Sequence, residues 1–239
     1  MFILFNIAMM PYYILMAAAI IPPVVLMIYM YNNDRYEREP AYMVWRTIGA
    51  GIMAALAAMV LEYVFEAVFF NSSVQPSTDV SIHEAIMVGL VEEGCKLFFL
   101  YRATWKSPEF NYRYDGILYA GFVSLGFAAF ENVMYVFSNG LGVAVSRALL
   151  SIPAHLAFGV LTGLFYSRAK VMQVEGNPFC GIMIFLGWLV SSSLHACYDG
   201  SLFVGSNMSM ALFVGIVILI YVIVFVIVKK EAKNDRPIY

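Results

Sequence analysis

The segment Gly89-Leu-Val-Glu-Glu-Gly-Cys-Lys-Leu-Phe-Phe-Leu100 places three ionisable side chains inside an apolar run. These side chains are Glu92, Glu93 and Lys96. At mid-membrane each such charge costs about 2.5–3.5 kcal/mol, and two further apolar runs contain Glu131 and Asp199. Ionisable side chains within membrane spans are rare and usually functional. The segment therefore predicts a transmembrane helix that carries part of a functional site.

The composition of the whole chain supports a membrane location. Of its 239 residues, 62% are hydrophobic and only 13% are charged, whereas soluble domains are roughly 45–50% apolar and about 25% charged. Long apolar runs cross a bilayer as helices, because a helix satisfies its own backbone hydrogen bonds. The fold class is thus predicted to be an all-α polytopic membrane bundle. The net charge of −2 says nothing about nucleic acid, and no basic patch is large enough to suggest it, so no nucleic-acid partner is expected.

Hydropathy predicts seven transmembrane spans. They cover about 11–31, 46–69, 81–101, 115–137, 146–168, 181–202 and 208–228. Pro22 and Pro23 are expected to kink the first span. No segment repeats and no linker is long enough to separate domains, so one integral-membrane domain is predicted over residues 1–239.

Basic residues occur at alternate connections between these spans. The loops after spans one, three and five and the C-terminal tail contain or border on Arg35, Arg38, Arg46, Arg102, Lys106, Arg113, Arg168, Lys170, Lys229, Lys230, Lys233 and Arg236. The loops 70–80, 138–146 and 203–207 contain none, although Arg147 borders the second. Because Lys and Arg are enriched on the cytoplasmic side, we predict the N-terminus outside and the C-terminus in the cytoplasm.

The polar side chains of four spans are predicted to lie at similar depths. With a rise of 1.5 Å per residue, Glu92 and Glu93 fall about 16–18 Å, and His155 about 13 Å, below the outer ends of their spans. Glu131 and His195 fall about 24 and 21 Å above the inner ends of theirs. We therefore expect one polar cluster in the central to outer part of the membrane.

Local spacing pairs several of these residues. His195 and Asp199 lie one helical turn apart, so the carboxylate can orient the imidazole. Lys96 lies one turn after Glu92 and is expected to neutralise only one of the two neighbouring glutamates. Asn132 follows Glu131 directly and is expected to support it.

Three other polar or small-residue features are weaker signals. His83 and Glu84 begin like the zinc motif HExxH, but Met87 stands where the second histidine should be, so the motif is rejected. Arg147 at the outer rim is either structural or a contact for substrate or lipid. Gly159 and Gly163, which follow His155 at one-turn steps, permit close helix approach within the bundle or between chains.

Four motifs in order, each on its own span, resemble those of the PrsW family of intramembrane proteases. They are Glu92-Glu93-x-x-Lys96, Phe127-x-x-x-Glu131-Asn132, Pro153-x-His155-x-x-x-Gly159 and His195-x-x-x-Asp199. The loop Asp34–Pro40 also resembles a family motif. The CAAX prenyl endopeptidases are distantly similar, but they carry a second histidine where this chain has Glu131.

The resemblance implies a prokaryotic, multi-pass plasma-membrane protease. Its substrate would be a single-span membrane protein, such as the anti-sigma factor that the best-known family member cuts in regulated stress-response proteolysis. Glu92 or Glu93 would act as general base, Glu131 would face the same water, and Lys96 would tune the glutamates. His195, positioned by Asp199, would bind the oxyanion or protonate the leaving amine.

Whether this site holds a metal is open at this stage. In one version, His155, His195 and one carboxylate, Glu92 or Glu131, hold zinc and leave one position for water. In the other, the glutamates and histidines act without a cofactor. Two non-enzymatic functions also fit intramembrane ionisable residues, namely a proton- or cation-coupled transporter and a scaffold that binds partner helices.

Overall fold

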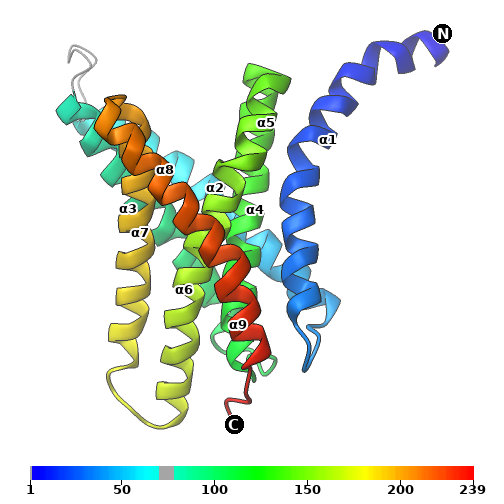
Figure 1. Ribbon diagram of the computed structural model, residues 1–239. Coiled ribbons are helices and arrows are strands. Elements are labelled where there is room, and N and C mark those ends of the chain that lie inside the picture. Colours follow the sequence, from blue (N-terminus) through cyan, green and yellow to red (C-terminus); the bar gives the residue numbers. More distant parts are fainter. Residues whose placement is uncertain (1, 70–77) are drawn as a thin grey trace.

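The chain forms a bundle of long helices, and the structure, a computed structural model, describes residues 2–69 and 78–239 (Figure 1). The helices are α1 (Phe2–Asn33), α2 (Ala41–Phe69), α3 (Thr78–Thr104), α4 (Arg113–Asn139), α5 (Leu141–Leu149), α6 (Ser151–Val174), α7 (Cys180–Val204), α8 (Asn207–Val222), the π-helical turn η1 (Ile223–Ile227) and α9 (Val228–Lys233). These described residues include no strand, which confirms the all-α class. The predicted outer loop at 71–77 lies outside the described residues.

Six segments are long and apolar enough to cross a membrane. They are Met10–Asn33, Ala41–Val68, Arg113–Asn139, Leu141–Val174, Cys180–Val204 and Asn207–Lys233. The remaining long helix, α3, has 27 residues and so measures about 40 Å, but its buried charges lower its apolar character. The predicted membrane bundle of about seven helices is confirmed, with α3 as the atypical member.

The predicted fifth span, 146–168, is wrong in its extent and in its continuity. The crossing runs from Leu141 to Val174 and is interrupted at Leu150, between α5 and α6. Pro153 explains the interruption, because it lacks an N–H and its ring would clash with the carbonyl group of Leu149 in a continuous helix. In contrast, α1 continues as a helix through Pro22 and Pro23.

Helix α4 lies at the centre of the bundle and has its most extensive contacts with α6, α2 and α1. Every residue from Tyr114 to Ala128 is buried. A Cβ atom at Gly163 would lie 2.6 Å from Cα of Ile117, and one at Gly51 would clash with the backbone oxygen of Val123. The small residues on α6 and α2 therefore allow their backbones to contact α4 directly, so the face at Gly163 packs within the bundle.

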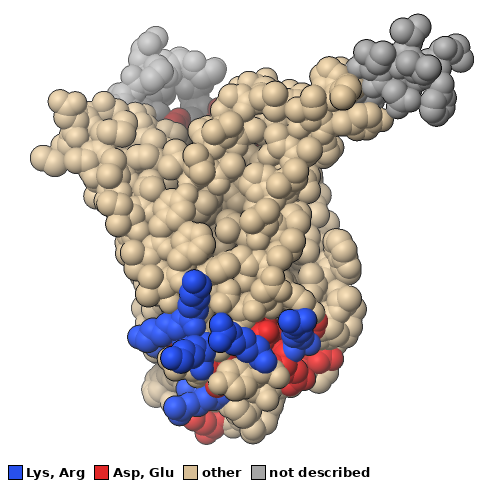
Figure 2. Space-filling view, turned by 45° about the vertical axis from the view of Figure 1, so that its right-hand side comes forward, with Lys and Arg blue, Asp and Glu red and all other residues tan. Residues whose placement is uncertain are grey.

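The predicted basic connections meet at one end of the bundle, which we call the basic end. On the face drawn in Figure 2, the Lys and Arg side chains gather there. The C-terminal tail is fixed to the α3–α4 connection, where Tyr114 N–H donates to Asp235 Oδ1 (2.8 Å) and Ile238 N–H to the Asn111 carbonyl (2.7 Å). The Tyr36 hydroxyl of the loop after α1 donates to the Lys233 carbonyl (3.3 Å).

Buried carboxylates lie beneath this end. Asp34 and Glu39 are 3% and 4% exposed, and one oxygen of each, Oδ2 and Oε2, has no hydrogen-bond partner. Burial raises the pKa of Glu39 to about 7, with a smaller contribution from the charges of Asp34 and Glu109. Burial likewise raises the pKa of Asp34 to about 6. The folded protein therefore favours the protonated form of both groups.

Replacing Gly51 by Val should destabilise the bundle, because the new side chain would clash with α4 backbone that cannot move aside. Overpacking of this kind costs about 3 kcal/mol, which should lower the midpoint of thermal unfolding in detergent by about 10 °C. Gly49→Val on the same helix is the matched control, since nothing lies within 4 Å of a Cβ there. Equal midpoints for the two variants would contradict the close α2–α4 contact.

The stability of the protein should depend on pH through Glu39. Because its pKa is raised from 4.5 to about 7 in the folded state, its stabilising contribution is complete below pH 4.5 and is lost as pH rises through 7. The midpoint of thermal unfolding should thus fall between pH 4.5 and 7.5, and fall less in Glu39→Gln. Glu37→Gln, which alters an exposed carboxylate of the same loop, should follow the unsubstituted protein. If the unfolding midpoint changed equally with pH in Glu39→Gln and in Glu37→Gln, this role of Glu39 would be refuted.

Candidate active site

Four helices bring the predicted site residues together in the middle of the bundle. Glu92, Glu93 and Lys96 come from α3, Glu131 and Asn132 from α4, His155 from α6, and His195 and Asp199 from α7. Direct contacts link Glu131 to His155, His155 to Lys96, and Glu93 to His195. The expected meeting of these side chains in one cluster is therefore observed, whereas their depth in the membrane and their catalytic roles stay predictions.

Lys96 is the centre of the cluster on α3. Its Nζ lies 3.1 Å from Glu92 Oε2 and 2.7 Å from Glu93 Oε1, and all three residues are buried. Glu92 and Glu93 precede Lys96 by four and three residues, so both lie within its reach. Its single positive charge is shared between them and can balance only one of the two carboxylates, as expected. The ammonium group also lies 4.0 Å from the centre of the Phe127 ring.

His195 lies between two carboxylates from different helices. Its Nδ1 is 3.1 Å from Glu93 Oε1, and its Nε2 is 3.3 Å from Asp199 Oδ2. The ring of Phe158 stacks on the imidazole at 4.6 Å between centroids. The predicted pairing with Asp199 is confirmed, and the contact with Glu93 fixes the other side of the ring.

The contacts of His155 assign its tautomer. Nδ1 lies 3.0 Å from Lys96 Nζ, and Nε2 lies 2.9 Å from Glu131 Oε2. A lysine ammonium can only donate, so Nδ1 accepts and the ring hydrogen on Nε2 points to Glu131. His155 therefore connects the charges on α3 to the carboxylate on α4.

Arg147 on α5 completes the surroundings of Glu131. Its Nη2 lies 2.7 Å from Glu131 Oε2, and its Nε donates to Asn132 Oδ1 at 3.0 Å. The Asn132 amide donates in turn to the Ala19 carbonyl on α1 (2.7 Å). Asn132 thus supports Glu131 only through Arg147, and the structural role considered for Arg147 is observed.

A cavity of about 580 Å³ opens onto this cluster; we call it the reaction cavity. Its carboxylate, guanidinium and imidazole side chains are those of Glu62, Glu92, Glu131, Arg147, His155, His195 and Asp199. Glu93 and Lys96 lie behind this lining and do not reach the cavity. Of the two glutamates considered as the base, only Glu92 could therefore contact a substrate.

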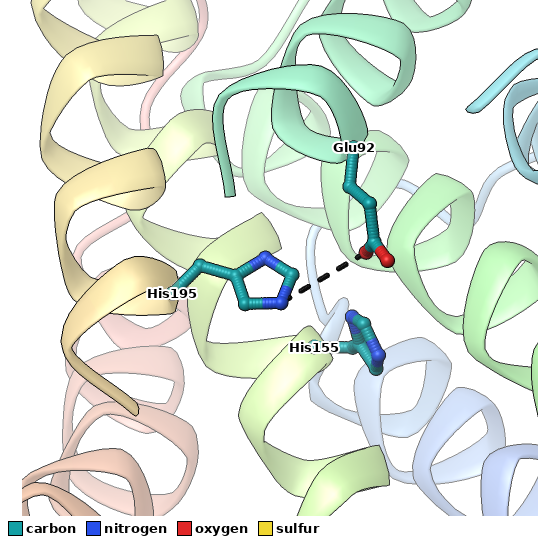
Figure 3. Close-up of side chains that lie close together, drawn as sticks. All are labelled: Glu92, His155 and His195. Atoms are coloured by element: carbon teal, nitrogen blue, oxygen red, sulfur yellow. Dashed lines mark ion pairs between the residues drawn. The ribbon is translucent and has the colours of Figure 1, made fainter. Parts of the chain in front are cut away.

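Glu92, His155 and His195 form a candidate metal centre (Figure 3). Each offers one ligand atom, and these atoms lie within 4.8 Å of one another, which no other such group among the described residues achieves. Two imidazoles and one carboxylate are a common ligand set of catalytic zinc, which leaves one position for water. Glu93 contacts Nδ1 of His195 and matches the carboxylate that usually orients a ligating histidine, so that Nε2 faces Glu92. His155 would ligate through Nδ1, and the residues fit a metal when Lys96 Nζ, 3.0 Å from that atom, moves aside.

Glu62 on α2 is a lining residue that the sequence analysis missed. It is a carboxylate inside a predicted span and follows Ala55, Ala58 and Met59 at helical spacings of seven, four and three residues. All four line the reaction cavity. The missed signal was the pair Glu62 and Glu66, two acidic side chains one turn apart that follow small residues on the same face of α2.

Removing the ammonium group of Lys96 should destabilise the fold. In Lys96→Met two buried carboxylates lose their shared cation, which should cost about 3–5 kcal/mol in the free energy of unfolding. Adding Glu93→Gln should recover part of this loss, which a double-mutant cycle of unfolding measurements would detect. Lys106→Met, at an exposed position, should change stability by less than about 0.5 kcal/mol. A comparable loss in both lysine variants would argue against this buried pairing.

Comparison with known sequences assigns the chain to a family. Residues 39–228 match a family model described as "PrsW family intramembrane metalloprotease". Protease PrsW of Halalkalibacterium halodurans is 32% identical over 222 residues, which cover 93% of this chain and 99% of that relative. Protease PrsW of Geobacillus kaustophilus is 34% identical over 77% of this chain and 78% of its own length, and that of Bacillus subtilis is 33% identical over 81% and 84%. No solved structure matches the chain. The chain therefore belongs to the PrsW family of intramembrane metalloproteases.

Proposed function

We propose that the chain hydrolyses a peptide bond of a membrane-anchored client protein in the reaction cavity. The observation that supports this proposal most is the meeting of Glu92, His155 and His195 beside Glu131. These residues come from four helices, so their meeting requires the whole bundle. A buried polar cluster open to a cavity suits the hydrolysis of a bond that enters from the membrane.

Glu92, His155 and His195 would hold a divalent metal, for which zinc is the expected ion. When bound, the metal would polarise the scissile carbonyl group and lower the pKa of its water to about 7. Glu93 contacts Nδ1 of His195 and is assigned as a positioning residue, so that Nε2 would bind the metal beside Glu92. Asp199, 3.3 Å from Nε2, is assigned as a second positioning residue. Lys96 contacts both glutamates on α3 and would balance the charge of one of them.

Glu131 is assigned as the general base. Arg147 and His155 both contact its Oε2, so among the described contacts Oε1 is left for water. Glu131 would take one proton as the water oxygen bonds to the carbonyl carbon, and would return it to the amine as the C–N bond breaks. Arg147, which also lines the cavity, would stabilise the negative charge that develops on the carbonyl oxygen.

We place the cavity in the outer half of the cell membrane and the basic end in the cytoplasm. Helices α4 and α7 both begin at the basic end, and Glu131 and Asp199 lie in their last third and last quarter. A client would thus be cut near the outer end of its own membrane span. That the client is an anti-sigma factor stays a prediction from the family resemblance.

The role of Glu131 as general base and the role of His195 as metal ligand can be separated by replacing each residue in turn. Glu131→Gln should lower the cleavage of a single-span client by about 10²–10⁴-fold and retain the metal, whereas His195→Ala should lose both. Cleavage would be followed on gels, and metal content by elemental analysis of the purified protein. Ser193→Ala, on the exposed side of α7, should retain both properties.

Persistent cleavage in both site variants would remove the assignment of the active site. Full activity of the protein without bound metal, after treatment with a chelator, would instead favour the version without a cofactor. A proton-coupled flux in the absence of any cleavage would support the transporter alternative.

A further inference from the structure

A second, smaller cavity adjoins the reaction cavity. It has a volume of about 330 Å³ and lies between α2 and α3, where Phe203 of α7 covers one side. Glu62, Val88 and Phe203 line both cavities, so the two spaces meet at these residues. A client chain that places its scissile bond at Glu92 could extend from the first cavity into the second.

Glu62 differs from every other carboxylate of the reaction cavity. Glu92, Glu131 and Asp199 each lie within 4.0 Å of a cationic or imidazole nitrogen. Glu62 takes part in no ion pair among the described residues, and its Oε1 is buried without a hydrogen-bond partner. A buried acceptor without a partner is costly, so a ligand that donates to it gains affinity.

The rest of the second cavity favours a cationic donor. Glu66 and Glu84 also line it, and no Lys, Arg or His does. Its other side chains are apolar, among them Phe65, Met87 and Val91. Lys and Arg bury an apolar stem and keep a charged head at a polar partner, which matches a cavity with apolar walls and carboxylates.

We propose that Glu62 is a specificity-determining residue that binds a Lys or Arg side chain of the client. The proposal rests on the protease function described above. Glu84 precedes Glu92 by eight residues, or about 12 Å along α3, which is the length of about four extended residues. The cation therefore lies within about four residues of the scissile bond.

A preference for a Lys or Arg side chain near the cleaved bond would restrict the set of membrane proteins that the chain cleaves. Lys and Arg are depleted just outside the membrane, so few clients carry one near the outer end of their span. A carboxylate in the second cavity would distinguish these clients from the majority. The chain would then recognise a charge close to the cleaved bond in addition to an accessible membrane helix.

The test uses the full-length protein in detergent and single-span client peptides. Each peptide carries Lys or Gln at one position within four residues on either side of the cleaved bond. At the best position, kcat/KM should be about tenfold higher for Lys than for Gln, and Glu62→Gln should bring this ratio close to one. Glu175→Gln, an exposed carboxylate at the basic end, should leave the ratio unchanged.

A charge exchange separates recognition from folding. Glu62→Lys should prefer a peptide with Glu at the same position, and Glu66→Gln combined with Glu84→Gln should lower the Lys preference if Glu62→Gln does not fold. Equal rates for all peptides with the unsubstituted protein, or a Lys preference that survives in Glu62→Gln, would overturn the proposal.

Binding measurements keep this test independent of the proposed protease function. If no peptide is cleaved, that function fails for these clients, and fluorescence anisotropy of the labelled peptides still reports on Glu62. Tighter binding of the Lys peptide that is lost in Glu62→Gln would support the assignment, whereas equal affinities would refute it.

Discussion

The ammonium group of Lys96, held between Glu92 and Glu93, is the interaction on which the site depends. Two carboxylates without this cation could not both stay ionised among buried helices, because desolvation would exceed any attraction that remained. The pairing allows α3 to occupy an interior position although its charges set it apart from the six apolar crossings. It also fixes His155, since the same Nζ lies 3.0 Å from its Nδ1. The ammonium group on one helix therefore determines which nitrogen of a histidine on another helix carries the hydrogen.

Backbone packing sets the distances within the cluster. Gly51 and Gly163 let α2 and α6 approach α4 so closely that a methyl group would not fit. His155 then reaches Glu131 directly, at 2.9 Å. Larger residues at these crossings would separate the helices, and a separation of about 1 Å is enough to lose a hydrogen bond. The small residues are thus as much a part of the site as the ligands, although they contact no substrate.

Local spacing made part of this arrangement predictable. The pairs His195 with Asp199 and Glu92 with Lys96 lie one turn apart on their own helices, so the sequence alone indicated them. The contacts of Glu93 with His195 and of Arg147 with Glu131 depend on how neighbouring helices are rotated about their axes, which hydropathy does not report. The break at Leu150 was predictable from Pro153, but the apolar run continues through it and hid the interruption. Glu62 was missed because it matches no motif, and its charged neighbour one turn away, Glu66, is another acid with which it forms no ion pair.

The contrast between paired and unpaired carboxylates separates catalysis from recognition. Glu92, Glu93, Glu131 and Asp199 each contact a nitrogen of Lys, Arg or His, and these contacts hold their positions before any client arrives. Preorganisation of this kind suits bond cleavage, because the polar groups need not rearrange during the reaction. Such groups distinguish poorly among clients, since every peptide bond presents the same atoms to them. Oε1 of Glu62 has no hydrogen-bond partner among the described residues, so the energy of Glu62 changes most on binding and depends on which side chain the client supplies. The paired carboxylates thereby serve the cleavage reaction, which is the same for all clients. Glu62, which has no ion-pair partner among the described residues, serves the recognition of a side chain that differs between clients.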